Sequence, residues 1–346
     1  MHSVRAEARH FPALDGVRGV AILLVIAHHA RLFGSGWIGV DLFFVLSGFL
    51  ITGVLVRAKA RPHYFRNFWA RRALRIIPAC AVFLAVLLIV SPWLLGERLP
   101  AHQMWLWLFA ANLTIARHGF DAVPPYTAHL WSLAVEEQFY LVWPAVVLAC
   151  SVRALRRVCV VGIALALTFR VVLHLGHTGL ATYVLMPTRM DTLLVGAWLA
   201  ITPVSRRAAT VVGVAAGMLT IAILTGHDAH SRIVETIGYT AIALSAGALV
   251  SLATQDARLI RLLSWRPLRI AGKYSYAAYL WQIAVLMEVG SRTSLAAGWP
   301  AFVAGTVGSF VLAWVSWRLI EAPALRLKRF FPEERPRELE TVLRAA

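Results

Sequence analysis

The chain has 346 residues, of which 59% are hydrophobic and 15% are charged. Soluble domains average about 45–50% apolar and about 25% charged residues, so this composition excludes a soluble globular or disordered protein. The formal net charge of +17 does not indicate nucleic acid, because Lys and Arg lie mostly in short loops between apolar runs. We therefore expect a multi-pass protein of the cell membrane, with lipids as partners and no nucleic acid.

Apolar segments follow one another along the whole chain. A helix needs about 20 residues to span the hydrocarbon core, and in lipid such segments must be helical because their backbone polar groups find no water. The predicted fold class is an all-α, polytopic transmembrane bundle. The eleven segments are residues 17–33, 40–56, 78–95, 104–116, 133–150, 158–175, 183–201, 208–225, 234–253, 274–289 and 300–320.

The segment 104–116 is too short for an ordinary crossing, and the loop charges indicate how to treat it. If it does not cross, most of the 34 basic residues lie on one side of the membrane, in agreement with the positive-inside rule. If it crosses, the basic residues that follow it move outside. We therefore expect about ten crossings, one short re-entrant or interfacial helix, and both termini in the cytoplasm. Residues 1–325 form the predicted membrane domain and residues 326–346 a basic cytoplasmic tail.

The cysteines do not indicate a metal site. Cys80, Cys150 and Cys159 lie in or beside apolar segments and have no paired spacing. Neither a disulfide framework nor a zinc site is expected from them, and no other metal is predicted.

The first apolar segment carries Asp15, Arg18, His28 and His29. Arg18 and His29 are eleven positions apart, which places them within roughly 20° of one helical face and about 16 Å apart along the axis. Polar groups in membrane helices are candidates for function, and an imidazole suits proton transfer near neutral pH. The alternative is an interior histidine hydrogen-bonded to a neighbouring helix.

A basic stretch at residues 65–78 alternates aromatic and guanidinium side chains. Arg72 and Arg75 are an i, i+3 pair that can bind phosphate, with Arg71 beside them. The alternative is an interfacial helix that contacts anionic lipid headgroups.

Further polar residues enter the bundle at two later segments. Ser132 and Glu136 lie in the stretch 129–140, where a buried carboxyl could exchange protons with a histidine. Arg189 and Asp191 enter the segment 183–201, either as site residues or as a local structural ion pair. In the stretch 36–51, Ser47 and Gly48 are expected mainly to allow close helix packing.

Together these stretches resemble the membrane acyltransferase 3 family over nearly the whole chain. The similarity rests on Leu14-Asp15-Gly16-Val17-Arg18-Gly19 with His29, residues 43–51, the Arg72/Arg75 pair, Trp131-Ser132 with Glu136-x-Gln138-Phe139-Tyr140, Ser275-Tyr276 with Tyr279-Leu280-Trp281, and Glu321-Ala322-Pro323.

The resemblance implies transfer of an acyl group, commonly acetyl, from acyl-CoA to a hydroxyl of a carbohydrate, a glycolipid or a glycosylated natural product such as a macrolide. It implies His29 as the central catalytic residue with Arg18 as its partner, Arg72 and Arg75 as donor-binding residues, and Glu136 as the acid of its motif. Tyr276 also lies within a family motif.

Two features differ from the family. Gln282 follows Trp281 where the family usually has a histidine, so a second titrating group is absent there. The extracytoplasmic domain that many members carry is also not expected in this chain. A competing interpretation from another functional class is a transporter or flippase for a glycolipid, a polysaccharide unit or an antibiotic, because polar groups along a helical bundle suit that function too.

Overall fold

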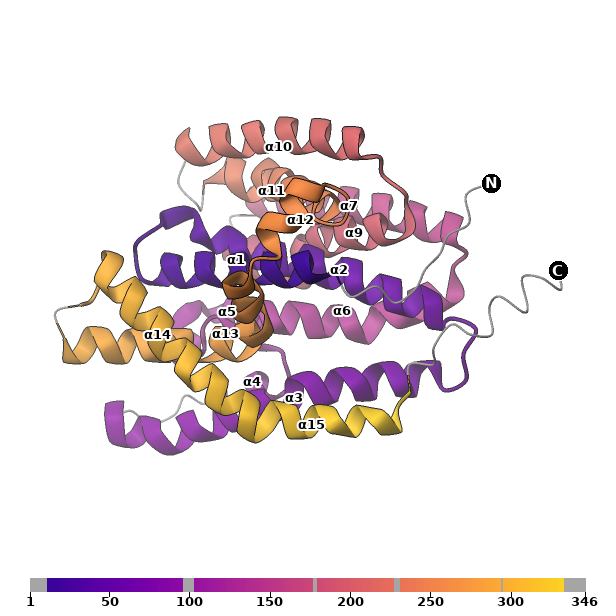
Figure 1. Ribbon diagram of the computed structural model, residues 1–346. Coiled ribbons are helices and arrows are strands. Elements are labelled where there is room, and N and C mark those ends of the chain that lie inside the picture. Colours follow the sequence, from indigo (N-terminus) through magenta and orange to yellow (C-terminus); the bar gives the residue numbers. More distant parts are fainter. Residues whose placement is uncertain (1–10, 96–102, 177–178, 227–230, 294, 333–346) are drawn as a thin grey trace.

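The computed structural model describes residues 11–95, 103–176, 179–226, 231–293 and 295–332, and this part of the chain is helical without any strand (Figure 1). Ten of its helices have 14 residues or more. They are α1 (Pro12–His29), α2 (Ile38–Ala58), α3 (Tyr64–Leu95), α6 (Leu130–Ala149), α7 (Val152–Leu175), α9 (Met186–Ile201), α10 (Arg206–Gly226), α11 (Tyr239–Leu252), α13 (Arg266–Arg292) and α14 (Gly298–Ser316).

Shorter helices and turns connect the long ones. They are η1 (Gly34–Trp37), α4 (Met104–Trp107), α5 (Ala111–His118), η2 (Phe120–Ala122), η3 (Pro125–Thr127), α8 (Gly179–Val184), η4 (Val234–Gly238), α12 (Ala257–Leu263), η5 (Trp317–Glu321), α15 (Ala322–Arg326) and η6 (Leu327–Phe330). Most of the expected cytoplasmic tail and the first ten residues lie outside the described residues.

Seven stretches of the described chain are long and apolar enough to span a membrane. They are Pro12–His29, Gly34–Ala58, Val152–Leu175, Leu180–Ile201, Arg206–Thr225, Val234–Leu252 and Gly298–Phe330. This confirms a multi-pass, all-helical membrane protein. Three further helices, α3, α6 and α13, have 32, 20 and 27 residues and are therefore of comparable length.

The helix boundaries follow local chemistry that the hydropathy pattern only partly indicated. The basic stretch and the segment 78–95 are continuous in α3. Segment 183–201 is instead interrupted, because Leu185 is extended and Pro187 occupies the first turn of α9, where its missing N–H costs nothing. The short segment 104–116 forms α4 and α5, of 4 and 8 residues, and neither is long enough to cross a bilayer.

Glycines bring the central helices into close contact. A Cβ atom on Gly48 of α2 would lie 1.8 Å from the Leu193 carbonyl oxygen of α9, and one on Gly196 would lie 2.0 Å from the Val45 oxygen. Small residues permit this approach, which membrane helices use because lipid gives no hydrophobic drive for their association. The expectation that Gly48 serves packing is confirmed. In Figure 1, α10 runs along one edge of the bundle and α3 and α15 lie along the opposite edge, with α1, α2 and α6 between them.

Candidate functional site

His29 is the last residue of α1, and its imidazole faces α13. Its Nδ1 lies 3.0 Å from the backbone oxygen of Val25 and 3.0 Å from Oε1 of Gln282. A backbone carbonyl can only accept a hydrogen bond, so Nδ1 carries the proton in a neutral ring. Nε2 then holds the lone pair, and this tautomer makes it the basic atom of the ring.

A second histidine, His129, lies beside this group just before α6. Its ring contacts Tyr279 and Phe83 at centroid distances of 5.1 and 6.1 Å, and His29 is within electrostatic range. Both ring nitrogens are buried and make no hydrogen bond of standard geometry with the described residues, and the backbone of Tyr279 and Leu280 lies close to the ring. Tyr279 bonds to the His129 carbonyl oxygen at 3.0 Å and to the Ser132 hydroxyl at 2.6 Å. We call His29, Gln282, His129 and Tyr279 the histidine cluster.

The arginines gather near the start of α1. Arg18 forms an ion pair with Asp15 at 3.1 Å and is within electrostatic range of Arg72 and Arg75 of α3. The side chain of Arg18 is 26% exposed. The Arg72 guanidinium lies 5.6 Å from the centre of the Tyr140 ring, in cation–π geometry. We call Arg18, Arg72 and Arg75 the arginine cluster.

Glu136 belongs to the arginine end of the site. It accepts a hydrogen bond from the Ser47 hydroxyl at 2.6 Å, and Ser47 in turn accepts one from Tyr140 at 2.9 Å. Arg72 and Arg18 are within electrostatic range of its carboxyl. The hydrogen bonds of the His29 ring go to Val25 and Gln282, so proton exchange between Glu136 and a histidine stays a prediction.

Two of the predicted residues make contacts away from both clusters. Arg71 donates to the backbone oxygen of Phe331 at 3.0 Å, which fastens the chain after η6 to α3. Tyr276 donates to the backbone oxygen of Ile76 at 2.7 Å and so joins α13 to α3. Ser132, by contrast, lies in contact with the histidine cluster through Tyr279.

Arg189 and Asp191 each pair with a residue of another helix, so the structure does not contain the local ion pair that was the alternative to a site role. Arg189 of α9 lies 2.6 Å from Asp41 of α2, and Asp191 lies 2.9 Å from Arg170 of α7. Thr240 also donates to Asp191 at 2.9 Å. All four charged side chains are buried, and we call Asp41, Arg189, Asp191 and Arg170 the charge network.

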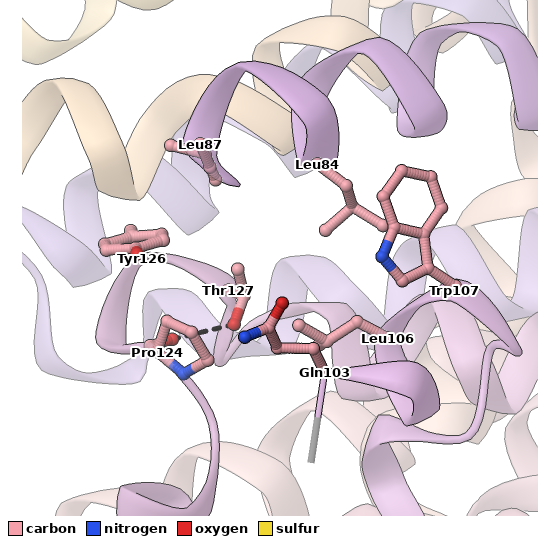
Figure 2. Close-up of a pocket in the computed structure, with 8 residues that line it drawn as sticks. All are labelled: Leu84, Leu87, Gln103, Leu106, Trp107, Pro124, Tyr126 and Thr127. Carbon is pink, nitrogen blue, oxygen red and sulfur yellow. Dashed lines mark hydrogen bonds between the residues drawn. The ribbon is translucent and has the colours of Figure 1, made fainter. Parts of the chain in front are cut away.

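Figure 2 shows a small cavity between α3, α4 and η3, with Trp107 beside Leu84 and Tyr126 opposite Leu87. Its volume of about 10 Å³ has room for about one water molecule and is far below the roughly 300–1,000 Å³ of typical ligand sites. In the described part of the chain, no group of three or more His, Cys, Asp or Glu side chains is arranged to hold a metal ion.

Sequence reasoning assigned no site role to several members of these clusters, although Tyr140 and Tyr279 lie in the family motifs. These members are Ser47, Tyr140, His129, Tyr279, Asp41 and Arg170. Each is a polar residue in or beside an apolar segment, which was the available signal. Their partners are far away in sequence, as in the pair of His29 and Gln282, so spacing alone could not join them.

The fold and these buried polar clusters define a multi-pass membrane protein with ionisable groups held inside its bundle. A family model described as "Acyltransferase domain" matches residues 11–318. The chain therefore belongs to this acyltransferase domain family, as the motifs predicted. No solved structure matches it.

Three curated relatives carry related names. The chain is 29% identical to the peptidoglycan O-acetyltransferase OatA of Listeria monocytogenes, over 93% of this chain and 57% of that protein. It is 31% identical to the putative peptidoglycan O-acetyltransferase YrhL of Bacillus subtilis, over 93% and 56%. The O-acetyltransferase OatA of Staphylococcus aureus is 28% identical, over 97% and 61%. The chain thus spans somewhat more than half the length of these relatives.

Proposed function

We propose that this chain is a membrane O-acyltransferase that transfers an acetyl group from acetyl-CoA to a hydroxyl of a carbohydrate. The observation that carries the proposal is the state of His29: its Nδ1–H is held by two carbonyl oxygens, so Nε2 is presented as a base. A general base on a hydroxyl is what acyl transfer to oxygen requires. The names of the relatives support a carbohydrate of the cell envelope as acceptor, ahead of a glycolipid or a glycosylated natural product.

We further propose that ten helices cross the membrane, with both chain ends in the cytoplasm. The seven apolar spans and the helices α3, α6 and α13 together make ten, because each of these three is long enough at about 1.5 Å per residue. Charged and amide side chains in α6 and α13 lower their hydropathy, as expected for helices that line a polar site. This topology places the arginine cluster toward the cytoplasm and His29 deeper in the bundle.

The arginine cluster would hold the CoA moiety. Guanidinium groups bind phosphate oxygens in bidentate fashion, and Arg72 and Arg75 lie one helical turn apart on α3. Glu136 lies within range of Arg72 and Arg18 and would balance their charge when no phosphate is bound. The pantetheine arm would pass from these arginines toward His29, a distance of about 16 Å along α1.

In the proposed reaction, Nε2 of His29 takes the proton of the acceptor hydroxyl while the hydroxyl oxygen attacks the thioester carbonyl carbon. A C–O bond forms and the carbonyl oxygen becomes negatively charged. The intermediate then collapses, the C–S bond breaks, and the CoA sulfur leaves with the proton that His29 held. His29 returns to its starting state, and the products are an acetyl ester and CoA.

The test uses His29→Ala with His28→Gln as matched control. His28 is the neighbouring histidine, and its Nδ1 lies 2.8 Å from the Gly34 carbonyl oxygen, a bond that glutamine can replace. Purified proteins receive radiolabelled acetyl-CoA and peptidoglycan fragments, and ester formation and CoA release are measured. We expect His29→Ala to lose both activities and His28→Gln to keep them. Full activity of His29→Ala would contradict the proposal, and acceptor movement without CoA release would favour a transporter.

A second test concerns the donor. Arg72→Ala combined with Arg75→Ala should weaken acetyl-CoA binding at least tenfold, because charged hydrogen bonds contribute about 1.5–3 kcal/mol each. Arg71→Ala is the control, since Arg71 bonds to the Phe331 backbone. Equal affinity for acetyl-CoA in the control and the double variant would indicate that Arg72 and Arg75 contact lipid headgroups instead of the donor.

A further inference from the structure

Gln282 has a donor that nothing in the described structure uses. The residue lies on α13 with a fully buried side chain, 0% exposed. Its Oε1 lies at the His29 Nδ1, whereas its Nε2 amide has no hydrogen-bond partner among the described residues. A buried unpaired donor is costly, so a native structure that retains one calls for an explanation.

The proton on His29 Nδ1 determines the orientation of the Gln282 amide. Because the Val25 carbonyl oxygen sets the proton on Nδ1 of His29, the atom of Gln282 that meets Nδ1 must be the acceptor Oε1. Nε2 is bonded to the same planar amide carbon as Oε1, so it is held within the histidine cluster while it makes no bond to Nδ1. A flipped amide would place two donors against each other.

His129 and Tyr279 belong to the same histidine cluster as Gln282. Tyr279 lies one helical turn before Gln282 on the same face of α13, and its ring contacts His129. Both ring nitrogens of His129 are buried and make no hydrogen bond of standard geometry with the described residues, although the backbone of Tyr279 and Leu280 lies close to the ring. The histidine cluster thus keeps buried polar capacity beside a candidate base, and a polar substrate group could use the Nε2 donor of Gln282.

We infer that Gln282 is a catalytic residue whose Nε2–H donates a hydrogen bond to the carbonyl oxygen of the acyl group. This inference rests on the proposed function. When the hydroxyl oxygen attacks, the carbonyl π electrons move onto that oxygen, and the Nε2–H stabilises the resulting oxyanion. When the C–S bond breaks, the electrons return to form the ester carbonyl and the hydrogen bond weakens. Oε1 keeps the proton of His29 on Nδ1 throughout.

Control of the His29 tautomer would explain the contact of Oε1 with Nδ1, but it would not explain the unpaired Nε2 donor. Two variants separate these roles. Gln282→Glu keeps an oxygen for Nδ1–H and removes the N–H donor. Gln282→Met removes both groups at similar volume. If tautomer control were the only role, Gln282→Glu would retain the turnover of the wild type at alkaline pH, where its carboxylate is ionised.

We expect kcat to fall about 10²–10³-fold in both variants, the usual effect of removing one oxyanion donor. The KM for acetyl-CoA should change little, because the donor contacts are remote. Gln282→Asn, which shortens the arm by one methylene, should also lose turnover and is the variant least prone to misfold. Wild-type kcat in Gln282→Glu or Gln282→Asn would overturn the inference.

A binding measurement distinguishes a catalytic role of Gln282 from a structural one, because a structural role would not affect the preference for a tetrahedral analogue. S-(trifluoroacetonyl)-CoA forms a tetrahedral hydrate that mimics the intermediate, whereas S-acetonyl-CoA stays a ketone. The wild type should prefer the fluorinated analogue at least tenfold, and Gln282→Met should lose this preference with unchanged affinity for CoA. An unchanged preference in Gln282→Met would overturn the inference. Loss of activity in His29→Ala with full activity in Gln282→Met would refute only this role of Gln282, whereas full activity in His29→Ala would refute the proposed function itself.

Discussion

The charge network allows a quantitative test of whether Arg189 is a structural or a site residue. The network contains two arginines and two aspartates, so its formal charge is zero, and its Arg189–Asp41 pair is buried with a separation of 2.6 Å. Removing one member leaves a net charge inside the bundle, which costs about 3–5 kcal/mol. Replacing both members by apolar side chains of similar size restores zero net charge. Such replacements often change the free energy of unfolding little.

The perturbation is Asp41→Leu, Arg189→Met, and the two together. We expect each single variant to lose about 3–5 kcal/mol in the free energy of unfolding and the double variant to lose far less than the sum. The free energy is measured by SDS titration in mixed micelles, with tryptophan fluorescence as the signal. Single variants that lose less than about 1 kcal/mol, or a double variant as unstable as the sum of the singles, would refute the reasoning. Acetyl transfer by a stable double variant would identify the pair as structural.

Three further outcomes can be checked on the same protein. Gly48→Ala should fail to assemble, because its Cβ would meet a carbonyl oxygen. Gly217→Ala, whose Cβ would have no atom within 4 Å, should leave stability unchanged or raise it. Monodispersity in detergent is measured for both variants. Asp256 caps α12, and hydrogen bonds from backbone N–H groups together with a neighbouring arginine lower its pKa, so its stabilisation is complete near neutral pH and is lost as the solution is acidified. Asp256→Ala should accordingly lower the melting temperature at neutral pH and have little effect in acid, and an equal effect at both would contradict this cause. Ser47→Ala removes the hydrogen bond to Glu136 and should reduce kcat/KM for acetyl-CoA about tenfold. Unchanged turnover of acetyl-CoA would exclude Glu136 from the donor site.

Hydropathy and charge predicted the class of this protein because both depend on composition within a segment. The helical period likewise placed Arg18 and His29 on one face of α1, and in the structure each belongs to a polar cluster at its own end of that helix. The break before Met186 was not predicted, although Pro187 was visible in the sequence. Its missing N–H is compatible with the first turn of a helix, and the pattern of apolar residues continues through it.

The pairing of helices could not be predicted in the same way. In a membrane, the lipid-facing and protein-facing sides of a helix are both apolar, so the period of hydrophobic residues does not show which face meets a partner. Ser47 illustrates this limit. Its small side chain suggested helix packing, whereas its hydroxyl donates to Glu136 across two helices. Gln282 is a second case, because its contact with His29 depends on how α1 and α13 are aligned.

The inferred role of Gln282 would also account for a glutamine at position 282, where the family usually has a histidine. A neutral histidine has one ring nitrogen that accepts and one that donates, and a glutamine amide likewise offers an acceptor and a donor. Oε1 meets the protonated Nδ1 of His29, and Nε2 remains available on the other side of the same group. Glutamine differs in that it cannot titrate, so its donor persists at every pH at which His29 is neutral. The pH dependence of turnover in this chain should therefore follow His29 and the leaving thiol, with no contribution from position 282.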